Sequence, residues 1–258
     1  MKKGIKLTLF VALGIAMLAT AAAGAPNTVG GSGITGTSHD LSTTGVATSF
    51  GIDTSATGTN NRICIFCHAP HNTKKPGSVG ADGKTYDYLP LWNHQFSTNT
   101  TWVPYTTGSA IVGDPGDPNN PANGIFATAD VSGGPGSVSK LCLSCHDGSV
   151  AVSAYGSSPS SGTKMSGNKQ IGAGGDLSNH HPIGFNYTDA WTKDLEIADP
   201  TTVLSSASGI RIKDVLIGNN MECITCHDVH NSKNEAGAEK FLWKSDQHSN
   251  LCLTCHKK

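Results

Sequence analysis

The chain has 258 residues, of which 37% are hydrophobic, 6% aromatic and 14% charged, and it carries 31 glycines, 12 prolines and 8 cysteines. An ordinary soluble domain is richer in both apolar and charged side chains, so either disorder or a bulky bound cofactor must account for the missing core material. The formal net charge of −1 provides no basic stripe, which argues against a nucleic-acid partner.

Residues 1–23 predict a secretory signal peptide. Three lysines precede an apolar run from Leu7 to about Ala22, and Ala23 completes an A-x-A spacing. This run is shorter than the roughly 20 residues that a bilayer span needs, so the alternative of an uncleaved anchor is disfavoured. We therefore expect an exported, mildly acidic mature chain over residues 24–258, located at the outer cell surface or outside the cell, with the periplasm as the alternative.

All eight cysteines belong to one repeated motif, C-x-x-C-H, although disulfides would be the default in an oxidising compartment. The motif is the c-type haem attachment signature, in which two thiols form thioethers with the haem and the histidine is the proximal iron ligand. A zinc site built from the last two motifs would leave the histidine unexplained, and thioredoxin-like pairs need a βαβ context. We therefore predict four covalently attached haem c groups, held by Cys64, Cys67 and His68; Cys142, Cys145 and His146; Cys223, Cys226 and His227; and Cys252, Cys255 and His256.

The sixth iron ligand decides between electron transfer and chemistry at the metal. Methionine is scarce: two of the four lie in the signal peptide, and Met221 is too near Cys223 to reach the far face of that haem. Bis-histidine iron is therefore the leading interpretation, and such iron carries electrons because it has no open position. The histidines that remain as candidates are His39, His71, His94, His180, His181, His230 and His248.

An internal repeat narrows these candidates. The first and third motifs continue to a histidine three residues after the proximal one, at His71 and His230, whereas the second and fourth share the pattern L-C-L-[ST]-C-H. This alternation predicts two dihaem modules, about 24–160 and 161–258. Because His71 and His230 share a turn with their own proximal histidine, we expect each to ligate the iron of a neighbouring haem.

Three further histidines complete the predicted ligand set. His39 and His181 are the upstream distal ligands expected in the two modules, and His94 is an additional candidate whose alternative role is a nearby hydrogen bond. Leu91-Trp92 before His94 has an echo in Leu242-Trp243, while His180 and His248 are treated as spare. His39 lies early in a polar arm that could reach an adjacent subunit, and such a head-to-tail contact would propagate into a filament.

Several segments then resemble the multihaem outer-surface c-type cytochromes of metal-reducing bacteria: Arg62–Asn72, Pro90–His94, Lys140–Gly148, His181–Phe185 and 251–256. The haem count and order are similar to those of the tetrahaem nanowire cytochromes of the OmcE type. This resemblance implies bis-histidine iron throughout, alternating stacked and T-shaped haem pairs, a filament of repeated subunits, and one distal histidine donated across the subunit junction.

The fold expected is that of a multihaem cytochrome c: mostly coil, with short helices around the haem motifs, little strand, and haems as the core. Helices are predicted over 139–146 and 246–256, and 97–138 is predicted to be loops with a short hairpin near Trp102 to Tyr105. The function expected is electron transfer without catalysis, between redox partner cytochromes and an extracellular acceptor such as a metal oxide. A soluble periplasmic shuttle is the first alternative, and a multihaem reductase the second.

Overall fold

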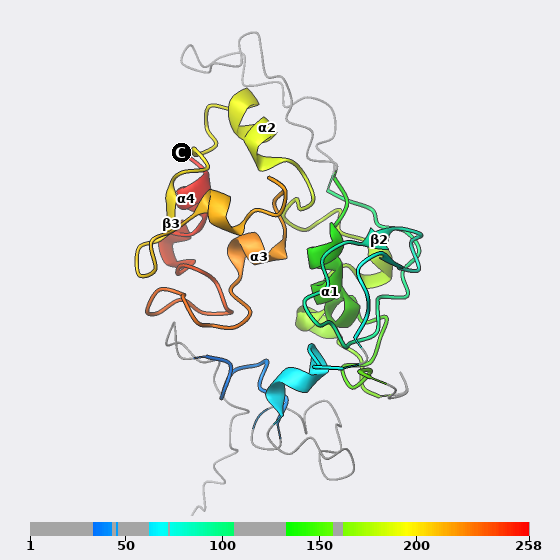
Figure 1. Cartoon of the computed structure of the whole chain (residues 1–258). Coiled ribbons are helices and arrows are strands. Elements are labelled where there is room, and N and C mark those ends of the chain that lie inside the picture. Colours follow the sequence, from blue (N-terminus) through cyan, green and yellow to red (C-terminus); the bar gives the residue numbers. More distant parts are fainter. Residues whose placement is uncertain are drawn as a thin grey trace, which may run out of the picture.

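The computed structural model of the chain describes residues 33–42, 45, 62–71, 73–105, 133–156 and 162–257. The predicted signal peptide lies outside the described residues, as does most of 97–138. Over the described part, helices and strands are short and most of the chain is coil, as the sequence predicted (Figure 1). The helices and strands are 3₁₀ helix η2 (Ile63–Phe66), β1 (Ser78–Val79), β2 (Thr85–Tyr86), α1 (Ser137–His146), 3₁₀ helices η3 (Gly167–Lys169) and η4 (Ala173–Gly175), α2 (Tyr187–Lys193), β3 (Val203–Ser205), β4 (Ile210–Arg211), η5 (Ile212–Val215), α3 (Cys223–Cys226), η6 (Gln247–Ser249) and α4 (Cys252–Cys255).

Helix α1 is the central element. It begins two residues before the predicted start and is buried around its circumference, with even Lys140 only 3% exposed. Lys140 is held by a 3.1 Å ion pair with Asp82 and lies 4.5 Å from the ring centre of Tyr86. This arrangement compensates the buried ammonium group and fixes the β1–β2 hairpin against α1.

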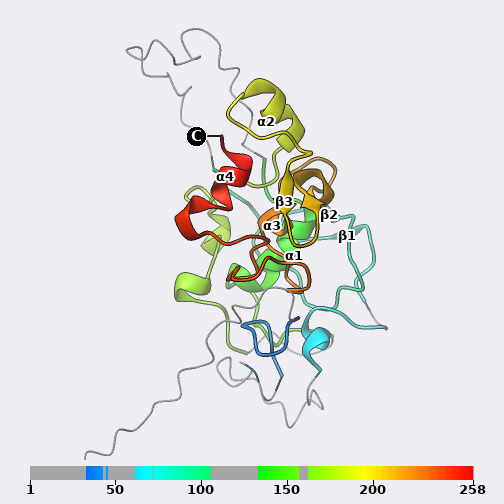
Figure 2. The ribbon, with the colours of Figure 1, turned by 90° about the vertical axis from the view of Figure 1, so that its left-hand side faces the viewer.

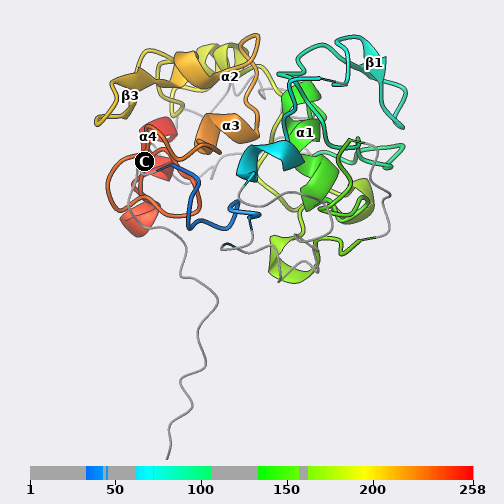
Figure 3. The same ribbon diagram turned by 60° about the horizontal axis from the view of Figure 1, so that its bottom comes forward.

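Helices α1 and α3 lie side by side in the middle of the molecule, and η2 approaches α1 from below (Figures 1 and 3). Leu141 of α1 packs in a cluster that includes Cys67, next to η2. Figure 2 shows α4 beside the C-terminus, beyond α3, with α2 at the far end of the molecule from η2. The four motif segments thus occupy neighbouring positions in the molecule.

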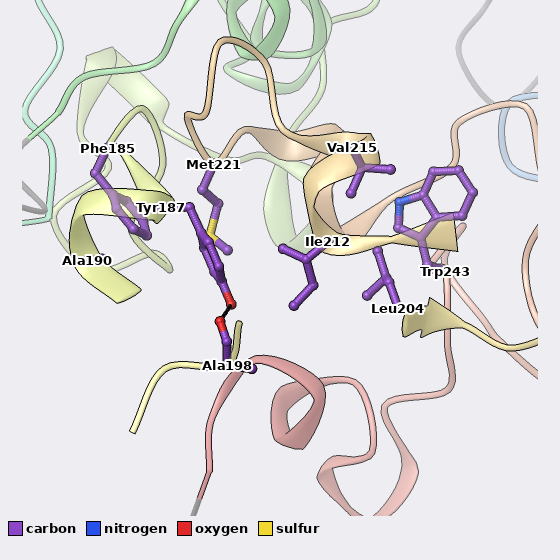
Figure 4. Close-up of a cluster of buried hydrophobic side chains, with 9 residues drawn as sticks. All are labelled: Phe185, Tyr187, Ala190, Ala198, Leu204, Ile212, Val215, Met221 and Trp243. Carbon is purple, nitrogen blue, oxygen red and sulfur yellow. Dashed lines mark hydrogen bonds between the residues drawn. The ribbon is translucent and has the colours of Figure 1, made fainter. Parts of the chain in front are cut away.

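Each of the two sheets contains only two antiparallel strands, β1 with β2 and β3 with β4. The second hairpin belongs to the largest cluster of buried apolar side chains among the described residues, where Leu204 and Ile212 pack near Tyr187 and Met221 (Figure 4). The Tyr187 hydroxyl donates a 3.0 Å hydrogen bond to the carbonyl of Ala198 (Figure 4). Met221 is therefore a core residue.

Two predicted elements differ from the structure. The 246–256 helix is broken into η6 and α4, because His248 and Ser249 have positive φ values of 53° and 59° that interrupt the helix. Near Trp102 to Tyr105, where a hairpin was predicted, Val103 forms an isolated parallel bridge with Asp176, and the residues from 106 to 132 lie outside the described residues.

Candidate functional site

Each C-x-x-C-H motif lies on one turn of helix. In the first, third and fourth motifs the histidine N–H donates to the carbonyl of the first cysteine, at 2.7, 3.1 and 2.9 Å. In the second motif the whole sequence C-L-S-C-H lies within α1. This turn fixes both cysteines and the following histidine relative to one another, as covalent attachment to one porphyrin edge requires.

Three of the proximal histidines are oriented by backbone carbonyls. The Nδ1 atoms of His68, His146 and His227 lie 2.6, 3.0 and 2.9 Å from carbonyl oxygens of Pro90, Lys169 and Lys240. An Nδ1–H donated to a carbonyl leaves Nε2 unprotonated and free to bind a metal.

The first and third motifs share one hydrogen-bond frame. His68 forms an antiparallel bridge with Trp92, and His227 forms one with Leu242. Asn93 and Trp243, which follow Trp92 and Leu242, each make two hydrogen bonds to the neighbouring motif. The backbone N–H donates to the carbonyl of the second cysteine, and the side chain donates to the carbonyl of the residue three positions before the histidine. These bonds are Asn93 N to Cys67 O, 2.7 Å; Trp243 N to Cys226 O, 3.0 Å; Asn93 Nδ2 to Ile65 O, 2.9 Å; and Trp243 Nε1 to Ile224 O, 2.8 Å.

This hydrogen-bond pattern changes the alignment that was expected between Leu91-Trp92 and Leu242-Trp243. Trp92 corresponds in space to Leu242, so Leu91-Trp92 and Leu242-Trp243 are offset by one residue. His94 then corresponds to Lys244 and not to His248, so these two histidines are not repeat equivalents.

Three pairs of histidine rings lie close together, with interplanar angles of 49°, 26° and 69°. The ring centres are 6.1 Å apart for His39 and His146, 6.2 Å for His68 and His230, and 6.3 Å for His181 and His256. Bonds from a transition metal to imidazole nitrogen are about 2.0 Å long, so one metal ion between two facing imidazoles separates their centres by roughly 6 Å. In each pair one ring belongs to a C-x-x-C-H motif, and the gap fits a single iron with two axial histidines.

A buried donor near the first motif also fits a haem. The indole N–H of Trp92 is buried, its ring lies 6.1 Å from that of His68, and it has no hydrogen-bond partner within the described part of the chain. A haem carries propionate carboxylates that can accept such a bond. The buried Trp92 N–H therefore fits the haem that the C-x-x-C-H motifs imply.

The remaining candidates are placed differently. His94 is fully buried, and its Nε2 lies 3.1 Å from the Ala151 carbonyl and 3.3 Å from Cys145 Sγ rather than opposite a proximal histidine. His71 is exposed. Among the described residues, no histidine ring faces that of His227 as in the three pairs, and His71, His180 and His248 face none of the proximal histidines.

Neutral imidazoles are favoured at the centre. Burial and the nearby His146, His227 and His230 lower the pKa of His39 to about 4, and burial also lowers the pKa values of His94 and His227. His39 stacks on Phe241 with ring centres 4.6 Å apart. Its ring is thus held inside the chain and uncharged at neutral pH, which is the form that binds iron.

The cysteine thiols show which motifs are neighbours. A hydrogen bond with Cys223 raises the pKa of Cys142, which connects the second and third motifs. Burial together with the nearby Cys67 raises the pKa of Cys145, which connects the second motif to the first. Burial followed by Cys255 raises the pKa of Cys226 to about 12, which connects the third motif to the fourth. The attachment points thus follow each other in sequence order through space.

A buried carboxylate that sequence reasoning missed joins the two central motifs. Glu222 accepts hydrogen bonds from Gly136 N, at 3.2 Å, and from the Ser139 hydroxyl, so it caps the N-terminus of α1 from another segment. Ser139 Oγ in turn accepts from Cys223 N at 2.9 Å. Burial raises the pKa of Glu222. Nothing in the local sequence signals this bond, because its partners are more than 80 residues apart.

Comparison with known proteins supports the class of protein. The family described as the doubled CXXCH motif matches residues 218–258, which hold the third and fourth motifs. No curated protein matches the chain significantly. The motifs imply covalently bound haem c, and the doubled motif indicates a multihaem c-type cytochrome that binds haem for electron transfer. Within the described residues no helix has the length and hydropathy that a bilayer crossing requires.

Proposed function

We propose that the chain is an exported tetrahaem cytochrome of the OmcE type, without catalytic residues, which relays single electrons and assembles into filaments. The observation that carries the electron-relay part is the set of three facing histidine pairs at 6.1 to 6.3 Å. Haem iron with two histidine ligands would supply the one-electron carrier and would offer no open position to a substrate. The neighbouring cysteines of successive motifs support a continuous path through the molecule.

The chain contributes the geometry of this relay. Backbone carbonyls orient the proximal histidines, and His39, His181 and His230 are the distal ligands that the pairs support. In this proposal His230, from the segment of the third motif, serves the haem of the first motif, which its 6.2 Å ring-centre distance from His68 supports.

We propose a junction other than the one expected at His39. His39 was expected on an arm reaching an adjacent subunit, but it lies against His146 and Phe241 of its own chain. We propose instead that the iron on His227 receives its sixth ligand across the junction, because no ring faces His227 within the described residues. His71 is the candidate donor, since it is exposed and follows a proximal histidine in the same way as His230.

The test measures haem content, spin state and assembly in the exported protein. Mass spectrometry should show four haems per chain. Filaments should show four low-spin haems that do not react with carbon monoxide, whereas monomers should show three low-spin haems and one that binds it. Electron microscopy reports the filaments. Four low-spin haems in a monomer would support the soluble periplasmic shuttle, and one carbon-monoxide-reactive haem inside intact filaments would favour the reductase.

The partners proposed are redox cytochromes on the donor side, further copies of the chain, and an extracellular acceptor such as a metal oxide. The mildly acidic mature chain and the absence of a basic stripe in the sequence give no support to a nucleic-acid role. Reduction of the purified filament by a low-potential cytochrome, followed by reoxidation with a ferric oxide suspension, tests both ends of the relay.

A further inference from the structure

The loop that follows the third motif, residues 228–233, is closed by one carboxylate. Asp228 is buried, and its Oδ1 accepts a hydrogen bond from the backbone N–H of His230 at 3.1 Å. Its Oδ2 accepts from the backbone N–H groups of Ser232 and Lys233, at 2.8 and 2.9 Å, and from the Ser232 hydroxyl at 3.1 Å. The carboxylate therefore fixes the turn of the chain that carries His230.

The same loop holds the N-terminal segment that carries His39. The Gly33 N–H donates to the Asn231 carbonyl at 2.9 Å, and the Asn231 side chain donates back to the Gly33 carbonyl at 3.0 Å. Burial lowers the pKa of His39, and a hydrogen bond between its ring and the Val229 backbone opposes this lowering. Val229 directly precedes His230, so one loop carries one of the proposed distal ligands and contacts the other.

A second contact of His39 is also connected to Asp228. The rings of His39 and Phe241 are stacked with an interplanar angle of 22°. The backbone N–H of Asp228 donates to the Phe241 carbonyl at 2.6 Å. Val229 and Phe241, which both contact His39, are thus respectively adjacent in sequence and hydrogen-bonded to Asp228.

The first motif has the same backbone arrangement without the carboxylate. Ala69 occupies the position that Asp228 has in the third motif, and its N–H likewise donates to a backbone carbonyl, that of Leu91, at 3.1 Å. His71 is the counterpart of His230, but over the described part of the chain its ring lies beside none of the proximal histidines. The first motif thus has the spacing of the third but lacks its carboxylate, and its downstream histidine is placed differently.

We propose that Asp228 is a positioning residue for two distal ligands of two different haems, His230 for the first motif and His39 for the second. This inference rests on the proposed function, since it requires haems at these motifs. Asp228 does not bind iron and acts through the loop. Hydrogen bonds from backbone N–H groups to a carboxylate are roughly twice as strong as those between neutral groups. Removal of this acceptor leaves several donors without a partner and releases both histidines together.

The test counts the haems that bind carbon monoxide in the reduced monomer of the four-haem holoprotein. Asp228→Ala should add two such haems to the wild-type count, whereas His230→Ala should add one. Asp199→Ala is the matched control, because Asp199 also accepts a backbone N–H and a hydroxyl, both from Thr201, but its turn holds no histidine. This variant should leave the wild-type count unchanged.

Hydrogen exchange measured by mass spectrometry gives a second readout. Residues 33–42 should exchange faster in Asp228→Ala than in the wild type, because the loop that holds them is released, and Asp199→Ala should not change their exchange. Asp228→Asn keeps the size of the side chain and one of its two acceptor oxygens. It should give a carbon monoxide amplitude between those of the wild type and Asp228→Ala, and it decides the question alone if the alanine variant loses haem.

The proposal is overturned if the Asp228 variants retain four haems and their carbon monoxide amplitude does not rise, even if the melting temperature falls, because that would show a purely structural role. A gain of one haem in Asp228→Ala, with unchanged exchange over residues 33–42, would overturn the assignment for His39. Fewer than four haems in the wild-type protein would instead refute the proposed function.

Discussion

At the scale of single residues, the axial histidines are distinguished by what their nitrogen atoms face. Proximal Nδ1 atoms bond to carbonyls and leave Nε2 for iron, whereas both nitrogens of His94 lie near backbone carbonyls, of Gln95 and of Ala151. These contacts distinguish His94 from the proximal histidines, which the sequence alone does not do.

Replacing any one of His39, His181 or His230 by alanine should open one coordination position. We expect the carbon monoxide difference spectrum of the reduced monomer to gain an amplitude corresponding to one additional haem in each variant. His248→Ala is the control, because His248 is exposed and should leave the spectrum unchanged. An unchanged spectrum for His230→Ala would contradict its pairing with His68.

His94→Ala should give the opposite pattern. The ring is fully buried and lies within hydrogen-bonding distance of the Gln95 and Ala151 carbonyls, so its loss should cost about 1–3 kcal/mol of stability. No new carbon monoxide binding is expected. Thermal unfolding followed in the Soret band measures the first effect, and a new high-spin haem would show instead that His94 is an iron ligand.

At the scale of elements, helix α1 depends on a cap supplied from another segment. Its own N-cap residue is Gly136, which has no side chain, and Glu222 provides the acceptor that the first turn lacks. The link also joins the two predicted modules, because Ser139 belongs to the first and Glu222 to the second.

Glu222 should make stability depend on pH. Its pKa is raised in the folded protein, so its contribution to stability is complete below the ordinary value of 4.5 and is lost as the pH rises through the raised pKa. Glu222→Gln should remove this decline. The melting temperature of the holoprotein measured between pH 4 and pH 8 should fall less with pH in this variant than in the wild type. Glu239→Gln serves as the control, and a profile unchanged by Glu222→Gln would contradict the assignment.

Sequence reasoning predicted some elements and missed others for physical reasons. Helix α1 was predicted because its motif fixes a helical turn. Helix α2 was missed although it has a local signal, since the side chain of Asn186 accepts a 2.9 Å hydrogen bond from Asp189 N. The proximity of His68 and His230 was not predicted, because sequence periodicity does not report which distant segments meet.

At the scale of the whole molecule, buried apolar side chains form four small clusters in the described part of the chain. The largest lies around Tyr187 and Ile212, in the second half of the sequence. The motif segments contribute to three of these clusters, through Phe66, through Leu141 with Cys67, and through Cys255.

Loss of covalent haem attachment should therefore lower the stability of the protein more at the motif on α1 than at the C-terminal motif. The double variant Cys142→Ala, Cys145→Ala removes both anchors on α1, which contacts α3 and the β1–β2 hairpin, whereas Cys252→Ala, Cys255→Ala affects a segment whose first cysteine is exposed. We expect three haems in each and a lower melting temperature for the first. Mass spectrometry and thermal unfolding measure both, and equal melting temperatures would contradict the central role of α1.

The separation in sequence between His68 and His230 has a consequence for how the protein is assembled. Both thioether anchors of a motif lie within one turn, so in the exported tetrahaem protein proposed above each haem could be attached as soon as its own motif has crossed the membrane. The partner of His68, however, is His230, and more than half of the sequence separates them. During N-to-C translocation the earliest cofactor would therefore remain without this axial partner until the third motif emerges, and a chaperone or a small-molecule ligand would have time to occupy the vacant side.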